Sequence, residues 1–193
     1  MKPLAREDLL SLENYAVQRA DFRARAITHK KARTIRIGEH LTLIFEDRLS
    51  IQYQVQEMLR IERIFEAEAI QDELDAYNPL IPGGDDLKAT LLLEFPDVEQ
   101  RRRELVRLRD IEHAIELTVD GQPPVVAIAD EDMPRSNEEK TSAVHFLRFA
   151  FTAAQISAWK AGAAVSLAST LAELPVTTRL SDEQHQALAA DFD

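Results

Sequence analysis

The sequence predicts an α+β fold: a single domain with a mainly antiparallel sheet and a long central helix packed on it. Two stretches, residues 34–47 and 115–130, each place two β-rich runs around a glycine-containing turn, which is the pattern of a hairpin. Between them, helical spacing of apolar side chains runs from about residue 48 to 77. Because hairpins require antiparallel pairs, this mixture favours α+β over a doubly wound parallel sheet.

The N-terminal half predicts one helix, one hairpin and the long helix. Leucine and aromatic residues recur at helical spacing within residues 5–32, and the first hairpin turns within "GEH". The long helix begins near Asp47 or Ser50. It is expected to end at "YNPLIPGG", where two prolines and paired glycines interrupt it.

The C-terminal half alternates short strands with capped helices. "ATLLLEF" is an apolar strand, and Asp97 is a suitable N-cap for the helix that follows it. A second hairpin turns at Asp120 and Gly121, and a polar loop at residues 131–142 leads into the strand "AVHFLRFAF". Two further helices begin with the capping boxes "TAAQ" and "SDEQ", and "AAVSLAS" and "LPVTTRL" are short strands.

Composition limits the class of protein. A chain of 193 residues with 45% apolar residues can bury a core of its own, so we expect one domain over residues 1–193. Residues 164–193 are considered as a strand–helix appendage. The absence of cysteine excludes disulfides, thiol catalysis and cysteine-ligated metal sites. A net charge of −11 disfavours nucleic acid and anionic membranes as partners, and no apolar run approaches membrane-spanning length. We therefore expect a cytoplasmic protein.

Several carboxylates of the long helix share a side with its apolar residues. At about 100° per residue, Glu62, Glu66 and Glu73 fall in the stripe of Ile51 and Val55. Because a buried carboxylate must be paired or neutralised, Glu62 and Glu66 are expected to be buried beside Arg or Lys. Three interpretations are open: a metal cradle, a general base with a raised pKa, or a structural ion-pair network. No helix carries the Glu-x-x-His pair of di-metal sites, so the ion-pair network is preferred.

Basic segments and one histidine complete the set of candidates. "RARAITHKKARTIR" supplies either a solvated basic face or cations that face the long helix, whereas "QRRRELVRLR" is expected at the surface. His145 alternates with apolar residues along its strand, so its imidazole is expected to point into the core. A core histidine and a ligand or proton carrier both remain open. No Gly-x-Ser-x-Gly elbow, P-loop or dinucleotide fingerprint occurs.

Six blocks of the sequence together are similar to a known family. They are "FRARAITHKKAR", "LTLIFEDR", "QVQEMLRIERIF", "DAYNPLIP", "ATLLLEFPD" and "EKTSAVHFLRF". In order and spacing they resemble the bacterial domain-of-unknown-function family 3501 over about Leu4 to Ala163. The resemblance implies a small bacterial cytosolic protein found in the company of rubrerythrin-like and iron–sulfur redox proteins. It thereby suggests an accessory role in redox or metal metabolism, and it carries over no catalytic residue and no cofactor.

These observations nominate one candidate pocket. We expect it between the long helix and the strand of His145, roofed by the loop at residues 131–142. Its candidate residues are His29, Lys30, Glu57, Arg60, Glu62, Glu66, Lys140, His145 and Arg148. No metal ligand is assigned. Two functions stay open: a non-catalytic accessory or binding protein that serves redox partners or a small anion, and an enzyme with a carboxylate–histidine site that could use a non-haem metal.

Overall fold

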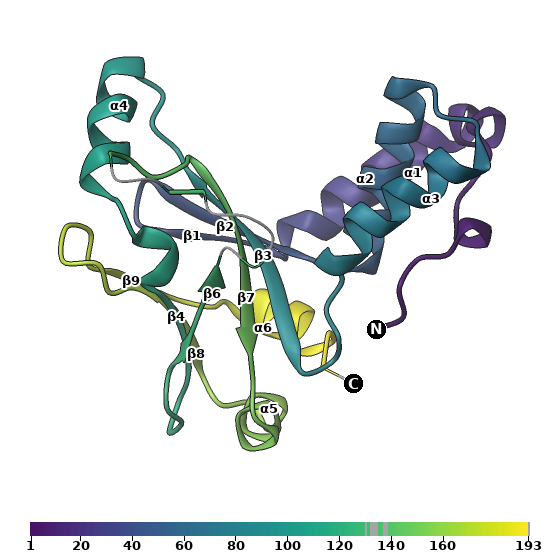
Figure 1. Ribbon diagram of the computed structural model, residues 1–193. Coiled ribbons are helices and arrows are strands. Elements are labelled where there is room, and N and C mark those ends of the chain that lie inside the picture. The colour runs from purple at the N-terminus through teal and green to yellow at the C-terminus, as the bar shows by residue number, and fades with distance from the viewer. Residues whose placement is uncertain (130, 132–134, 137–138, 193) are drawn as a thin grey trace.

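The computed structural model describes residues 1–129, 131, 135–136 and 139–192, and the chain forms two arms that meet at an angle (Figure 1). One arm consists of helices α1 (Leu12–Lys31), α2 (Arg48–Glu62) and α3 (Ala67–Tyr77). The other arm contains two antiparallel sheets, with α4 (Val98–Arg107) at its far end. The predicted α+β class is confirmed.

The first sheet has the strand order β1-β2-β3-β7-β6, and the second has the order β5-β4-β8-β9. The strands of the first are β1 (Thr34–Ile37), β2 (Leu41–Glu46), β3 (Asp86–Leu93), β7 (Val144–Ala150) and β6 (Ile128–Ala129). Those of the second are β5 (Val125–Val126), β4 (Ile115–Val119), β8 (Val165–Ser169) and β9 (Val176–Arg179). Both predicted hairpins are present, as β1 with β2 and β4 with β5.

The two sheets close on each other in a barrel-like arrangement. Only Ala127 separates β5 from β6, so one short segment of chain belongs to both sheets. On the opposite side β1 contacts β9, where Gly38 turns with φ +64° against Val176. Helices α5 (Ala153–Lys160) and α6 (Asp182–Ala189) contribute Trp159 and Leu188 to the enclosed core. Residues 164–193, considered above as an appendage, also place Val165, Leu167, Leu180 and Phe192 in that core.

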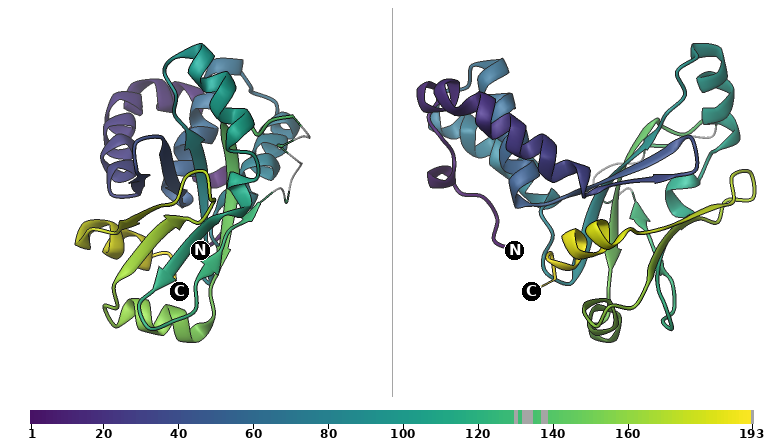
Figure 2. Two further views of the ribbon diagram at one scale, coloured as in Figure 1. Left: turned by 90° about the vertical axis from the view of Figure 1, so that its left-hand side faces the viewer. Right: turned by 180° about the vertical axis from the view of Figure 1, so that it is seen from behind.

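A second cluster of buried apolar residues holds the helical arm together. Its members are Leu4, Ile51, Val55, Leu59, Leu74 and Ile81. Helix α1 packs along α2, where the ring of Phe22 stacks on Tyr53 with 6.0 Å between centroids. The expectation of one core is therefore wrong, because α1, α2 and α3 bury their apolar sides against one another. Figure 2 shows the two arms from behind, with α6 near the place where they meet.

The long helix predicted over residues 48–77 is in fact two helices. Helix α2 ends at Glu62, and Arg63 adopts a left-handed conformation with φ 57° and ψ 47°. The N–H of Ile64 then donates to the carbonyl of Leu59 at 3.0 Å. This is a Schellman-type ending, in which apolar residues before and after the turn pack together, as Leu59 and Ile64 do here. The sequence conceals the break because arginine occupies a position that usually takes glycine.

Several local signals at helix ends are confirmed. Asp97 accepts a hydrogen bond from a backbone N–H of α4, and both predicted capping boxes form at the starts of α5 and α6. Three short 3₁₀ helices complete the elements: η1 (Arg6–Asp8), η2 (Asn78–Leu80) and η3 (Ile111–His113). Within the described residues no helix is long and apolar enough to cross a membrane. Positions 132–134 and 137–138 of the polar loop lie outside the described residues.

Candidate functional site

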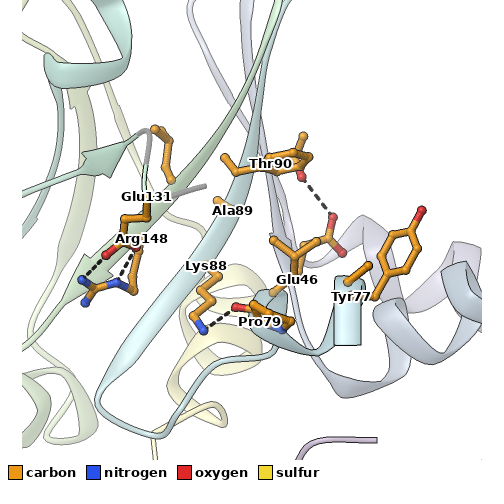
Figure 3. A pocket seen from close by; sticks show the side chains of 12 residues that line it. Glu46, Tyr77, Pro79, Lys88, Ala89, Thr90, Glu131 and Arg148 are labelled. Atoms are coloured by element: carbon orange, nitrogen blue, oxygen red, sulfur yellow. Dashed lines mark hydrogen bonds and ion pairs between the residues drawn. The ribbon is translucent and has the colours of Figure 1, made fainter. Parts of the chain in front are cut away.

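A cavity of about 590 Å³ lies where the end of the helical arm faces the first sheet (Figure 3). It is lined by Glu46, Ala76, Tyr77, Pro79, Leu80, Lys88, Ala89, Thr90, Glu131, Phe146, Leu147 and Arg148. A smaller cavity of about 280 Å³ shares five of these residues (Glu46, Tyr77, Leu80, Thr90 and Phe146) and adds Lys30, Ile44, Ile51 and Gln54. We call the two cavities together the groove.

The floor of the groove is the face of the first sheet that points away from the barrel core. Side chains alternate across a sheet, so the residues between the buried ones of β2, β3 and β7 point outward together. The strand register places Ile44, Thr90 and Phe146 in one row, and Glu46, Lys88 and Arg148 in the next. The second row gives the groove its charged side chains.

Lys88 links the floor of the groove to its roof, which is η2 and the residue that follows it. Its Nζ donates to the carbonyl of Pro79 at 2.6 Å and to that of Ile81 at 3.0 Å. The same ammonium lies 3.8 Å from the carboxylate of Asp86. These contacts hold η2 over the sheet, so a sheet side chain sets the position of the helical arm at this point (Figure 3).

Glu46 is the carboxylate near the middle of the groove. Its Oε2 accepts from Ser50 Oγ at 2.6 Å, and its Oε1 accepts from Thr90 Oγ1 at 3.3 Å. Lys30 Nζ lies 3.9 Å away. The Tyr77 hydroxyl lies toward the same side of the groove (Figure 3). Hydroxyl and carboxylate together offer a donor and acceptors to a bound molecule.

Arg148 and Glu131 form a two-pronged ion pair at the other side of the groove. Arg148 Nε and Nη2 donate to the two carboxylate oxygens of Glu131 at 2.8 Å and 2.6 Å. These hydrogen bonds hold the pKa of Glu131 below its usual range. The side chains remain 30% and 50% exposed, so the pair is accessible to solvent.

The structure does not bring the nine predicted residues together. Arg148 lines the larger cavity, Lys30 lines the smaller one, and His29 lies nearby with its Nε2 2.5 Å from the carboxylate of Asp47. Lys140 is exposed. The binding role assigned to each of these residues stays a prediction.

Glu57 and Arg60 lie within the helical arm. Glu57 accepts from the Tyr15 hydroxyl at 2.6 Å and from two nitrogens of Arg19 at 2.8 Å, and Arg60 lies 3.7 Å away. Arg19 is the main reason that the pKa of Glu57 falls to about 2. Glu57 therefore forms an ion pair between α1 and α2, but it is not one of the three acids, Glu62, Glu66 and Glu73, for which the ion-pair network was preferred.

Glu62 and Glu66 are exposed, which contradicts the expectation that both are buried beside cations. For Glu66 the reason is the turn at Arg63, which ends the helical register that had placed it in the apolar stripe. Glu62 keeps that register, but it is the last residue of α2 and its side chain is exposed there. Glu66 caps no helix turn with its side chain and instead accepts from the N–H of Phe65 at 3.3 Å. Burial raises the pKa of Glu73, and the neighbouring charge of Glu62 adds to this shift.

His145 is fully buried, as its strand position predicted. It points into the barrel core, whereas its neighbour Phe146 faces the groove. Its Nε2 lies 2.9 Å from Thr141 Oγ1, 3.0 Å from the Ser142 carbonyl oxygen and 3.8 Å from Glu112 Oε2. The carboxylate beside the histidine therefore comes from η3, and no acid of the long helix reaches it.

A buried arginine joins the two arms near the groove. Arg33 is 1% exposed and donates to the carbonyls of Phe45 and Ala187, each at 3.0 Å, and to the carboxylate of Asp191. Asp47 lies 3.7 Å from the same guanidinium. Burial raises the pKa of Asp191 to about 6 despite this arginine. For Asp47 burial acts in the same direction, but Arg33 and the Ser50 N–H outweigh it and the pKa is lowered.

Sequence reasoning missed Glu46, Tyr77, Lys88 and Thr90 as groove residues. A signal was present in "TLIFE" and "KATLLL", where polar residues occupy two of the three outward positions in each stretch and the inward positions are all apolar. Among the described residues, no group of three His, Asp or Glu side chains is arranged to hold a metal ion.

The fold and the groove define an α+β protein with a barrel-like pair of sheets, a lateral helical arm and a cavity of small-molecule size. The chain belongs to the family described as protein of unknown function DUF3501, whose model matches residues 3–192. It is similar to a novel protein of unknown function from Burkholderia pseudomallei K96243, known from a crystal structure. The two share 49% sequence identity with a TM-score of 0.93, and the match covers 100% of each chain. The comparison with curated proteins finds no match.

Proposed function

We propose that this protein is a cytoplasmic, non-catalytic binding protein whose groove takes a small amphipathic organic molecule. The observation that carries the proposal is the groove itself, about 590 Å³ with a further 280 Å³ beside it. Small-molecule sites typically have this size, with apolar walls and a few polar groups in fixed positions. Here Leu80 and Phe146 supply apolar wall, and the row from Glu46 to Arg148 supplies the polar groups.

The bonding of these polar groups supports recognition as their role. Glu46, Lys88 and Arg148 each make hydrogen bonds that fix their orientation, which reduces the entropy lost when a ligand binds. Nucleophilic catalysis needs an available nucleophile beside a base. Among the described residues that line the groove there is no serine or histidine, and the Thr90 hydroxyl and the Lys88 ammonium are engaged in hydrogen bonds with Glu46 and with backbone carbonyls.

A filled-groove variant tests the proposal. Ala76 is exposed on α3 and lines the larger cavity, so Ala76→Phe places a phenyl ring inside it. The probe is 8-anilinonaphthalene-1-sulfonate, an aromatic molecule with one anionic group, titrated by fluorescence. We expect its affinity to fall about tenfold, or ~1.4 kcal/mol.

Ala67→Phe is the matched control, because Ala67 is exposed on the same helix and lies outside the groove. It should leave the affinity unchanged. Equal binding by the wild type and both variants would place the probe elsewhere and refute the groove as the binding site.

The association with redox proteins is a separate part of the proposal. It rests on the family, whose members are expected in the company of rubrerythrin-like and iron–sulfur proteins. A ligand-binding accessory protein would serve such partners by holding a substrate or product of theirs. Affinity capture with purified candidate partners tests this, and Ala76→Phe against Ala67→Phe shows whether the groove contributes.

The second candidate is an enzyme with a carboxylate–histidine site. The observation in its favour is the buried set of Glu112, Thr141 and His145, in which the threonine hydroxyl lies 3.1 Å from the carboxylate and 2.9 Å from the imidazole. Both ionisable side chains are 0% exposed, so a substrate would reach them only after a rearrangement of their surroundings. Stoichiometric iron, manganese or zinc in protein purified without a histidine tag would favour this candidate over the binding protein.

A further inference from the structure

Two cations occupy adjacent positions on the floor of the groove. Lys88 on β3 and Arg148 on β7 are direct cross-strand partners, and both line the larger cavity. Like charges in this position repel each other unless acids neutralise them. Here Asp86 lies 3.8 Å from Lys88, and Glu131 binds Arg148 through both of its oxygens.

The two cations differ in what they are free to do. Lys88 is committed to the structure, because it donates to the carbonyls of Pro79 and Ile81. Arg148, in contrast, donates its two short hydrogen bonds to Glu131, whose side chain is half exposed. Ion pairs with this exposure contribute little to stability. A carboxylate from outside could therefore take the place of Glu131 at little cost to the fold.

We propose that the ligand of the groove is an organic monocarboxylate, whose carboxylate replaces that of Glu131 on Arg148. This inference rests on the proposed function and adds the class of ligand to it. Glu131 already shows the geometry, since a planar guanidinium binds a carboxylate through two parallel hydrogen bonds. The apolar body of the ligand then lies against Leu80 and Phe146.

The surrounding acids favour a carboxylate over a phosphate. Asp85 and Asp86 both act electrostatically on Arg148, and Glu46 lies in the same cross-strand row. A doubly charged phosphate would meet more repulsion from these acids than a single carboxylate. Because the hydrogen bonds from Arg148 lower the pKa of Glu131, the group to be replaced is itself an ionised carboxylate at neutral pH. When the ligand carboxylate replaces that of Glu131, the charge bound to the Arg148 guanidinium stays the same. Burial of the ligand's apolar body then supplies the net affinity.

The test compares three probes that share an eight-carbon chain: octanoate, octan-1-ol and octyl phosphate. Isothermal titration at pH 7.5 should show octanoate binding about tenfold more tightly than octan-1-ol, as hydrogen bonds to a charged partner imply. Octyl phosphate should bind more weakly than octanoate. Arg148→Gln should remove the preference for octanoate, and Glu131→Gln should strengthen octanoate binding several-fold without affecting octan-1-ol.

Arg36→Gln is the matched control, since Arg36 is an exposed strand arginine outside the groove. It should reproduce the wild-type pattern. Equal affinities for octanoate and octan-1-ol, or a preference that survives Arg148→Gln, would overturn the inference. If the fluorescent probe still responds to Ala76→Phe in that case, the groove stands as a binding site and only the ligand class is wrong. Failure of all probes to bind would refute both proposals.

Discussion

Replacing Arg33 by methionine tests how the two arms are held together. The guanidinium is 1% exposed, and its contacts reach β2 and the C-terminal helix region: the carbonyls of Phe45 and Ala187 and the carboxylates of Asp47 and Asp191. Methionine retains much of the volume but no charge and no donor. Two buried carboxylates then lose their common cation, and breaking such a pair costs about 3–5 kcal/mol.

Urea unfolding followed by circular dichroism at pH 7 measures this loss as a change in the free energy of unfolding. A domain with a total stability of about 5–15 kcal/mol would lose a large part of it. Arg36→Met is the control, because exposed substitutions usually stay within about 0.5 kcal/mol of the wild type. Adding Asp191→Asn to Arg33→Met should recover part of the loss, since it removes one of the uncompensated charges.

Two results would refute this reasoning. A loss below about 1 kcal/mol in Arg33→Met would show that solvent or rearrangement satisfies both carboxylates. Further destabilisation on adding Asp191→Asn would show that the aspartate matters for its other contacts and that its charge is not the source of the penalty.

Two further predictions follow from the buried ionisable groups. Burial raises the pKa of Asp191 to about 6 in the folded chain, whereas its pKa in the unfolded chain is near 3.9. Between these two pH values Asp191 is therefore protonated in the folded chain and ionised in the unfolded chain. The free energy of unfolding should therefore gain about 1 kcal/mol from this group as the pH falls from 7 to 5, and urea titrations of Asp191→Asn should lack that increment. His145→Asn should lower the free energy of unfolding by about 1–3 kcal/mol while the folded protein retains its affinity for the fluorescent probe, because the imidazole faces away from the groove. Lost probe binding at unchanged stability would instead assign His145 to the site.

Local patterns made several elements of the fold predictable. The hairpins at residues 34–47 and 115–126, the caps of α4, α5 and α6, and the inward direction of His145 all depend on residues close together in the chain. Strand alternation and side-chain capping act over one to four residues, so a single sequence contains all the information needed. The family was recognisable for a related reason, because its blocks are short and their order is visible in the sequence.

The tertiary structure decided where the long helix breaks and which acids are buried. Arg63 adopts a left-handed conformation without a glycine, because packing of Ile64 on the cluster of the helical arm compensates its conformational cost. Glu57 meets Arg19 where α2 packs on α1, while Glu62 at the end of α2 and Glu66 beyond the turn face solvent. No local pattern near residue 63 reports the position of the cluster that makes this turn favourable.

The sequence by itself determined the class of fold, the principal strands and the direction of their apolar faces. The groove was decided by tertiary structure, because Glu46, Lys88 and Arg148 come from three strands that only sheet register aligns in one row. Its roof depends on Lys88 reaching the carbonyls of Pro79 and Ile81. Alternation along a strand states which face a side chain takes, but strand pairing and contacts between the arms determine which side chains meet on that face.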